Sequence, residues 1–181
     1  MRELVHETQE DRTQAQQVNN CTFSHDGQLL LTGSDDCNAC IWHVKGEKLL
    51  SKIKGHTGPV KACVFSNDSN FFATGSCDCT VRLWKTKTGR CLYTLQGHSK
   101  SVETVCFNHN SKLLASAGWD YTAILWDTMA TGSWDYTIRV WRIRKPRQRI
   151  TLRGHTGNVS CVKFSAFGML ASASWDKTVR V

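Results

Sequence analysis

Tryptophan recurs at a fixed interval along the first part of the chain, and a similar stretch of sequence precedes each copy. The three stretches align without a gap as FSHDGQLLLTGSDDCNACIW, FSNDSNFFATGSCDCTVRLW and FNHNSKLLASAGWDYTAILW. Their first residues, Phe23, Phe65 and Phe107, and their last, Trp42, Trp84 and Trp126, each step by 42 residues. A constant period of this length is typical of a protein that stacks copies of one structural unit.

Turn-forming residues divide each repeat into four short strands. In the second repeat the strands are roughly VKACVF, NFFATGS, TVRLW and CLYTL. The connections between them are too short for a crossover helix, so neighbouring strands run antiparallel. One such sheet cannot hide both of its faces from water, and successive copies must stack face to face. The repeat therefore predicts an all-β fold, a β-propeller built from stacked four-stranded antiparallel blades.

The pattern GH…FS.D…ATGS.D.TVRLW resembles the WD repeat, and it extends from about Val18 to the end of the chain. Two later copies, ATGSWDYTIRVW and FSAFGMLASASWDKTVRV, carry parts of the pattern. We expect a polar N-terminal segment, residues 1–17, followed by a WD-repeat region, residues 18–181. The expected repeats are about 18–54, 55–96, 97–129, 130–153 and 154–181, and the last two are truncated.

The resemblance implies a hydrogen-bonded chain of four side chains in each repeat: a His before the first strand, a Ser or Thr on the second, an Asp in the next turn and a Trp on the third. The complete sets are His56, Thr74, Asp78 and Trp84 in the second repeat, and His98, Ser116, Asp120 and Trp126 in the third. Such a chain satisfies buried polar groups. A His, a Ser and an Asp also form hydrolase triads, but a set that recurs in successive repeats and includes a Trp favours a structural brace.

The sequence contains no familiar catalytic signature: no Gly-rich phosphate loop, no nucleophile elbow and no HExxH motif. Cys37-x-x-Cys40 and Cys77-x-Cys79 have spacings that occur in metal sites. However, Cys79 falls at the repeat position of Cys37, which favours small hydrophobic and turn residues instead. We predict a protein that is not an enzyme and that has no cofactor and no metal site.

The resemblance also implies that the residue before each turn Asp lies on the face where partners bind. These residues are Asp35, Cys77, Trp119, Trp134 and Trp175. Tryptophan is enriched at interaction hot spots, so the three tryptophans are the favoured contacts. Gly-His pairs stand at 55–56, 97–98 and 154–155, and positions shortly after each pair share this face: Pro59, Lys61, Ser101, Glu103, Asn158 and Ser160. The expected function is a scaffold that binds a protein or peptide. The alternative is that the tryptophans are duplicated repeat sequence, partly buried between blades.

The net charge of +8 is concentrated in one stretch of the chain. Residues 139–153 hold seven basic side chains and no acidic one: Arg139, Arg142, Arg144, Lys145, Arg147, Arg149 and Arg153. One interpretation is a solvated basic hairpin and outer strand, which also discourages edge pairing. The alternative function is a nuclear or nucleic-acid-associated factor that uses this segment.

The sequence shows neither a secretion signal nor a membrane span, because the first 17 residues have no apolar stretch and no run of about 18 apolar residues occurs. We expect a cytoplasmic and/or nuclear protein with no membrane partner. Nine cysteines are an odd number in a chain without an export signal, which favours reduced thiols over a disulfide framework.

The repeat is interrupted after Trp126. The next tryptophan in phase is Trp141, so about 27 residues are missing, and the last copy reaches Val181 one residue before its expected Trp. We expect about three full and two partial repeats, fewer than the roughly four to eight blades of closed propellers. Such an incomplete propeller indicates a fragment, a splice product or an erroneous gene prediction. Two open blade edges would favour poor solubility and self-association.

Overall fold

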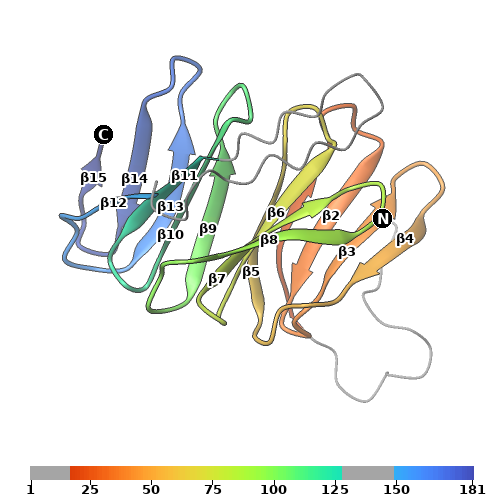
Figure 1. Cartoon of the computed structure of the whole chain (residues 1–181), viewed down its shortest axis with the longest axis horizontal. Coiled ribbons are helices and arrows are strands. Elements are labelled where there is room, and N and C mark those ends of the chain that lie inside the picture. The colour runs from red at the N-terminus through yellow and green to blue at the C-terminus, as the bar shows by residue number, and fades with distance from the viewer. Residues whose placement is uncertain (1–16, 128–148) are drawn as a thin grey trace.

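A computed structural model describes residues 17–127 and 149–181, and within these residues the chain forms β-strands and no helix (Figure 1). The strands make four antiparallel sheets, and in each sheet consecutive strands pair as a meander. We call these sheets the first to fourth blades. The predicted all-β fold of antiparallel blades is confirmed, with four strands in each of the first three blades and three in the fourth.

The strand bounds follow the repeat. The first blade consists of β1 (Val18–Phe23), β2 (Leu29–Ser34), β3 (Ala39–His43) and β4 (Lys48–Ile53). The second consists of β5 (Val60–Phe65), β6 (Phe71–Ser76), β7 (Thr80–Lys85) and β8 (Arg90–Gln96). The third consists of β9 (Val102–Phe107), β10 (Leu113–Gly118), β11 (Ala123–Asp127) and β12 (Arg149–Leu152). The fourth consists of β13 (Val159–Phe164), β14 (Leu170–Ser174) and β15 (Val179–Arg180).

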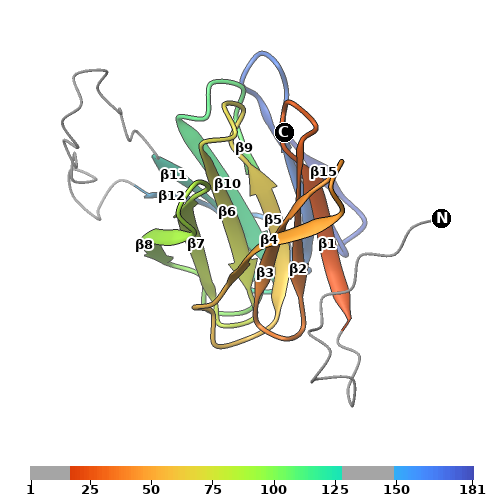
Figure 2. The same cartoon turned by 90° about the vertical axis from the view of Figure 1, so that its right-hand side faces the viewer.

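The blades stand side by side in chain order, from β1–β4 at one end of the row to β13–β15 at the other (Figure 1). The first strands of successive blades contact one another: β1 with β5, β5 with β9, and β9 with β13. Figure 2, which looks along the row, shows β1 on one side and the outer strands β8 and β12 on the other. The first strands are therefore the inner strands of the stack.

Apolar side chains fill the space between each pair of successive blades. We call the face that a blade turns toward the preceding blade its leading face, and the opposite one its trailing face. Between the first two blades, the trailing face contributes Leu31 and Ile41 and the leading face contributes Phe65, Phe72 and Trp84. The next junction contains Ala73, Val81 and Leu83 against Val102, Val105 and Trp126. The last contains Ala115, Ala117 and Ala123 against Val159 and Val162.

Glycines on the second strands allow the blades to approach closely. A Cβ atom on Gly33 would lie 2.7 Å from Cγ1 of Val60, and one on Gly75 would lie 2.8 Å from Cγ1 of Val102. Both distances are shorter than side-chain atoms tolerate, so only the missing Cβ lets the valine of the next blade sit against the strand backbone. The Gly of the TGS sequence shared by the first two repeats thus has a packing role.

The outer strand of the third blade comes from far along the chain. We expected residues 130–153 to form a truncated repeat of their own, whereas β12 pairs with β11 and completes the third blade. Ala123 faces Leu152 and Leu125 faces Ile150 in this pair. The equivalent pairs of the second blade are Val81 with Leu95 and Leu83 with Tyr93. The outer strand of the shortened copy therefore takes the register that a continuous repeat would give.

Truncation of Val102 to Ala should lower the free energy of unfolding by about 2 kcal/mol, because it leaves a cavity between the second and third blades, where Val102 is fully buried. Val18 occupies the same position of the repeat in the first blade but is half-exposed in the single chain, so Val18→Ala, compared at a protein concentration low enough to keep the chain monomeric, is the matched control and should cost well under half as much. Urea denaturation of the two variants measures both values. Equal losses would contradict the assignment of the core to the junctions between blades.

Candidate functional site

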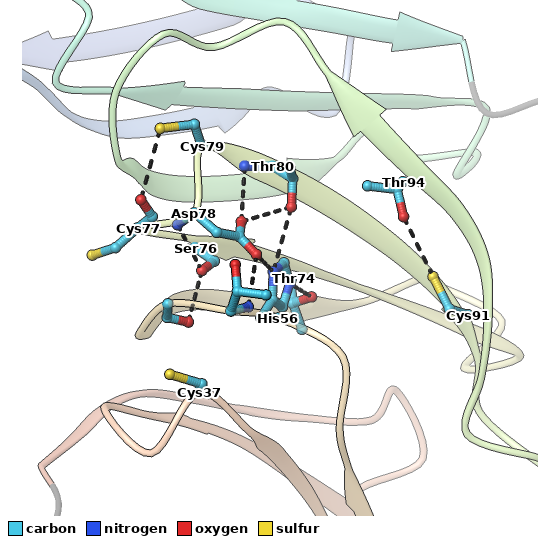
Figure 3. Close-up of polar contacts among 12 residues, drawn as sticks. Cys37, His56, Thr74, Ser76, Cys77, Asp78, Cys79, Thr80, Cys91 and Thr94 are labelled. Carbon is cyan, nitrogen blue, oxygen red and sulfur yellow. Dashed lines mark hydrogen bonds and ion pairs between the residues drawn. The ribbon is translucent and has the colours of Figure 1, made fainter.

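The second blade contains a continuous hydrogen-bonded chain of four side chains, three of which are labelled in Figure 3. Nδ1 of His56 lies 2.7 Å from Oδ2 of Asp78, and Nε2 lies 2.7 Å from Oγ1 of Thr74. The indole Nε1 of Trp84 donates to the same Thr74 oxygen at 2.8 Å. A carboxylate can only accept, so Nδ1 of His56 carries a proton and donates it to Asp78. In the neutral imidazole Nε2 is then the acceptor, and it receives the proton of the Thr74 hydroxyl.

The third blade repeats this arrangement. Nδ1 of His98 lies 2.8 Å from Oδ2 of Asp120, Nε2 lies 2.7 Å from Oγ of Ser116, and Nε1 of Trp126 donates to Ser116 at 2.8 Å. All eight residues expected to form the two chains are therefore hydrogen-bonded in two sets of four, one set in each blade. Serine and threonine are interchangeable here because only the hydroxyl takes part.

The fourth blade contains a hydrogen-bonded set of three side chains that was not predicted from the sequence. Nδ1 of His155 lies 2.8 Å from Oδ2 of Asp176, and Nε2 lies 2.9 Å from Oγ of Ser172. The signal in the sequence was weak, because one residue fewer separates the first paired residues of the hairpin: Phe164 pairs with Leu170, whereas Phe107 pairs with Leu114. This shifts Ser172 and Asp176 against the repeat. In the first blade, Trp42 donates to Thr32 at 3.0 Å.

The Asp of each chain is held as a carboxylate. Burial opposes ionisation of Asp78, but hydrogen bonds from Thr80, His56 and the Thr57 backbone outweigh it and lower the pKa of Asp78 to about 2. Asp120 has a pKa of about 2 for the same reasons, burial being outweighed by the His98 bond in particular. Every lone pair of such a carboxylate is used within its blade.

Burial lowers the pKa of His56, although the hydrogen bond to Asp78 acts in the opposite direction. The imidazole is therefore neutral near pH 7, as the proton positions above require. Thr74 and Ser116 are fully buried, and each hydroxyl is already engaged by a Trp and a His. A nucleophile has to reach its substrate, so these chains serve as braces between strands and turns and not as hydrolase triads.

The braces fix a row of turns at one edge of the blades. Each turn residue that precedes an Asp donates its backbone N–H to the carbonyl group that lies just before the inner strand: Asp35 to Gln17, Cys77 to Pro59, Trp119 to Ser101, and Trp175 to Asn158. The residue after each Asp has a positive φ of 65° to 67°: Cys37, Cys79, Tyr121 and Lys177. One turn geometry thus recurs in all four blades and brings the four turn residues to the same edge, which we call the turn rim.

Aromatic side chains gather at the turn rim of the third and fourth blades. The rings of Trp119 and Trp175 lie 6.4 Å apart, centre to centre, at 50° to each other. Their exposed fractions are 45% and 69%, so the contact between them leaves most of the pair open to water. Nζ of Lys100 lies 5.4 Å over the ring of Tyr121, a half-exposed neighbour that the sequence analysis missed. Trp134 lies outside the described residues.

Polar and charged side chains occupy the rim of the first and second blades. Nζ of Lys61 donates to Asp35 at 2.9 Å and to Asn19 at 3.2 Å, and Asn19 donates to Asp35 at 2.7 Å. The hydrogen bonds from Asn19 and Lys61 lower the pKa of Asp35. Asn19 was not expected here, although it is the repeat equivalent of Lys61.

The remaining candidate contacts connect the polar and aromatic parts of the rim. The Ser101 hydroxyl lies 2.6 Å from a Glu103 carboxylate oxygen and 3.2 Å from the Cys77 sulfur. Ser160 is exposed and donates to the carbonyl of Ala173 at 3.4 Å. The structure thus brings together Asp35 with Lys61, Cys77 with Glu103 through Ser101, and Trp119 with Trp175.

Sequence comparison agrees with the architecture. Residues 5–43, 47–85, 89–127, 128–142 and 146–181 match the WD40 family, described as WD domain, G-beta repeat. The chain belongs to the WD40 family. A stretch of 45 residues is 49% identical to Periodic tryptophan protein 2 of Saccharomyces cerevisiae, and the match covers 24% of this chain and 5% of the yeast protein. The WD40 chain therefore spans only a small part of that relative.

The cysteines of the WD40 repeats do not converge on a metal site in the described part of the chain. Residues 17–127 and 149–181 contain no group of three or more His, Cys, Asp or Glu side chains placed to hold a metal ion. Burial raises the pKa of Cys40 to about 12, which disfavours the thiolate that a metal requires. In the same residues, no helix is long and apolar enough to cross a membrane.

Replacement of Thr74 by Val should destabilise the WD40 chain by at least about 2 kcal/mol, because it leaves the Trp84 N–H and the His56 Nε2 buried without partners. Thr74→Ser keeps the hydroxyl and is the matched control, with Ser116 as the natural precedent in the third blade. Chemical denaturation followed by tryptophan fluorescence measures the difference. Equal stability of the Val and Ser variants would show that the chain of hydrogen bonds is not a brace.

The free energy of unfolding should decrease in two steps as the pH is lowered. The folded pKa of His56 lies below its ordinary 6.5, so the unfolded chain binds more protons and stability is lost as the pH falls below 6.5. Asp78 and Asp120 have folded pKa values of about 2 against an ordinary 3.8, so further stability is lost as the pH falls below 3.8. Urea midpoints measured between pH 8 and pH 3 record both steps.

The variant His25→Ala, which removes an exposed His, should keep the loss of stability below pH 6.5. The variant His56→Gln should remove much of that loss. A urea midpoint that stays constant between pH 7.5 and pH 5 in the unmodified chain would contradict the assignment of a neutral, buried His56.

Proposed function

We propose that this WD40 chain is a non-catalytic interaction module that binds a protein or peptide at the turn rim. WD40 repeats generally mediate protein–protein interactions, and the exposed Trp119–Trp175 pair is the observation that supports this particular surface. Trp is the residue most enriched at binding hot spots, and each indole can bury a large area on a partner.

The distribution of side chains along the rim supports a partner with two unlike parts. The pair of tryptophans offers an apolar platform at the third and fourth blades. Lys61 and Asp35 form an ion pair at the first and second blades, and the Glu103 carboxylate lies between the two regions. A peptide that places an aromatic or aliphatic side chain on the indoles and polar groups toward Lys61 and Glu103 would complement this rim. Cys77 and Ser160 are the further proposed contacts.

Several finer assignments rest on the same sequence patterns. From the residues of the second and third repeats, TGPVKACVFSNDSNFFATGSCDCTVRLW and SVETVCFNHNSKLLASAGWD, we propose a resemblance to WD repeat-containing protein 38, a small propeller. We place the chain in the cytoplasm and/or nucleus. The alternative role in nucleic-acid contact stays a prediction, since residues 139–148 of the basic run lie outside the described residues.

Peptides selected from a random library on the immobilised chain provide the probe for a direct test. We expect Trp119→Ala and Trp175→Ala each to weaken the selected peptide at least about tenfold in calorimetric titration, and the double variant to abolish detectable binding. Phe167→Ala is the control. Among the described residues Phe167 is the most exposed large apolar side chain, but it lies in the turn between β13 and β14, away from the turn rim. Full binding by the double variant would refute the site.

A further inference from the structure

The leading face of the first blade exposes residues whose repeat equivalents are buried. On β1 these residues are Val18, Cys21 and Phe23, and their equivalents on β5 are Val60, Cys63 and Phe65. Phe23 is 60% exposed whereas Phe65 is 6% exposed, and Val60 is completely buried. Val102 and Val159 begin the inner strands of the third and fourth blades and are also completely buried. The side chains are of the same kind, but no blade of the described residues packs against this face.

The trailing face of the fourth blade shows the complementary pattern. Val179 is 70% exposed, although its equivalent in the third blade, Ala123, is buried against the fourth blade. Met169 and Val181 are exposed as well. Lys163 also lies on this face. Its long aliphatic stem can pack on apolar surface while the ammonium group stays in water.

These two faces are the two halves of a junction that already recurs three times within the chain. We propose that the leading face of the first blade binds the trailing face of the fourth blade of a second copy of this chain. The contact is head to tail, so each copy uses a different face at each junction. Burial of apolar faces stabilises this contact, whereas an association of open blade edges would depend on strand pairing.

The number of blades indicates where such an assembly stops. A head-to-tail contact forms a ring when the rotation closes and an open filament when it does not. Two copies bring together eight of the described blades, which is within the range of about four to eight blades for closed propellers. A closed dimer covers the leading and trailing faces of all the described blades, so the assembly contains two copies.

Two native cysteines mark the proposed junction. Between the first and second blades, Sγ of Cys63 lies 3.3 Å from Oδ1 of Asn20. The repeat equivalents of these two residues on the uncovered faces are Cys21 on β1 and Cys161 on β13. Both are free thiols, and they are the exposed ones among the nine cysteines. In the proposed dimer, Cys21 of one copy faces Cys161 of the other.

A short bis-maleimide cross-linker applied to the full chain tests this pairing. We expect a covalent dimer whose cross-linked peptides join Cys21 to Cys161, and we expect Cys21→Ser and Cys161→Ser each to lose it. An equimolar mixture of the two variants should regain the link, because each supplies the thiol that the other lacks. A link from Cys21 to Cys21, or no covalent dimer from the mixture, would overturn the head-to-tail contact.

Sedimentation velocity provides the second readout. We expect the chain to sediment at twice its 20.4 kDa mass, and Phe23→Asp or Val179→Asp to raise the dissociation constant at least about tenfold. A mixture of these two variants keeps one intact junction and should form pairs that neither forms alone. Phe167→Asp, on a turn outside both faces, is the matched control and should remain dimeric. A monomer at all concentrations, or equal weakening by Phe167→Asp, would overturn the proposal.

Discussion

Burial of one blade against the next holds this structure together. A four-stranded sheet with two apolar faces needs a neighbour on each side to remove both faces from water. The inner-strand valines illustrate the point: Val60, Val102 and Val159 are completely buried, whereas Val18, at the same position of the repeat, is half-exposed. Each repeat supplies one face to the blade before it and one face to the blade after it. The fold is the stack of blades that these contacts form.

The hydrogen-bonded braces connect this stack to the turn rim. His56 and His98 lie before the inner strands of their blades, and each bonds to an Asp in the turn between the second and third strands. Indole, hydroxyl, imidazole and carboxylate form one satisfied set, which fixes the turn without leaving a buried polar atom unpaired. The turns can therefore carry exposed side chains such as Trp119 and Trp175 at defined positions, as an interaction surface requires.

Much of the fold could be predicted because each repeat is a local unit with its own turns, and the braces follow from residues within one period. Three features could not. β12 completes the third blade because strand pairing depends on register and not on which copy the strand came from. The contact between Trp119 and Trp175 joins two blades, and no spacing within a repeat fixes how closely neighbouring turns approach. Asn19 joins the Asp35–Lys61 pair across a junction in the same way.

Amide hydrogen exchange shows how far each blade depends on its neighbours, because it reports the stability of each strand separately. In the dilute monomer, β5 and β9 have neighbouring blades on both sides, so their amides should exchange most slowly. The amides of β1 and β13, which begin the blades with an uncovered face, should exchange faster. Protection of β1 equal to that of β5 would contradict this dependence, since it would mean that a blade is stable without a neighbour on its leading face.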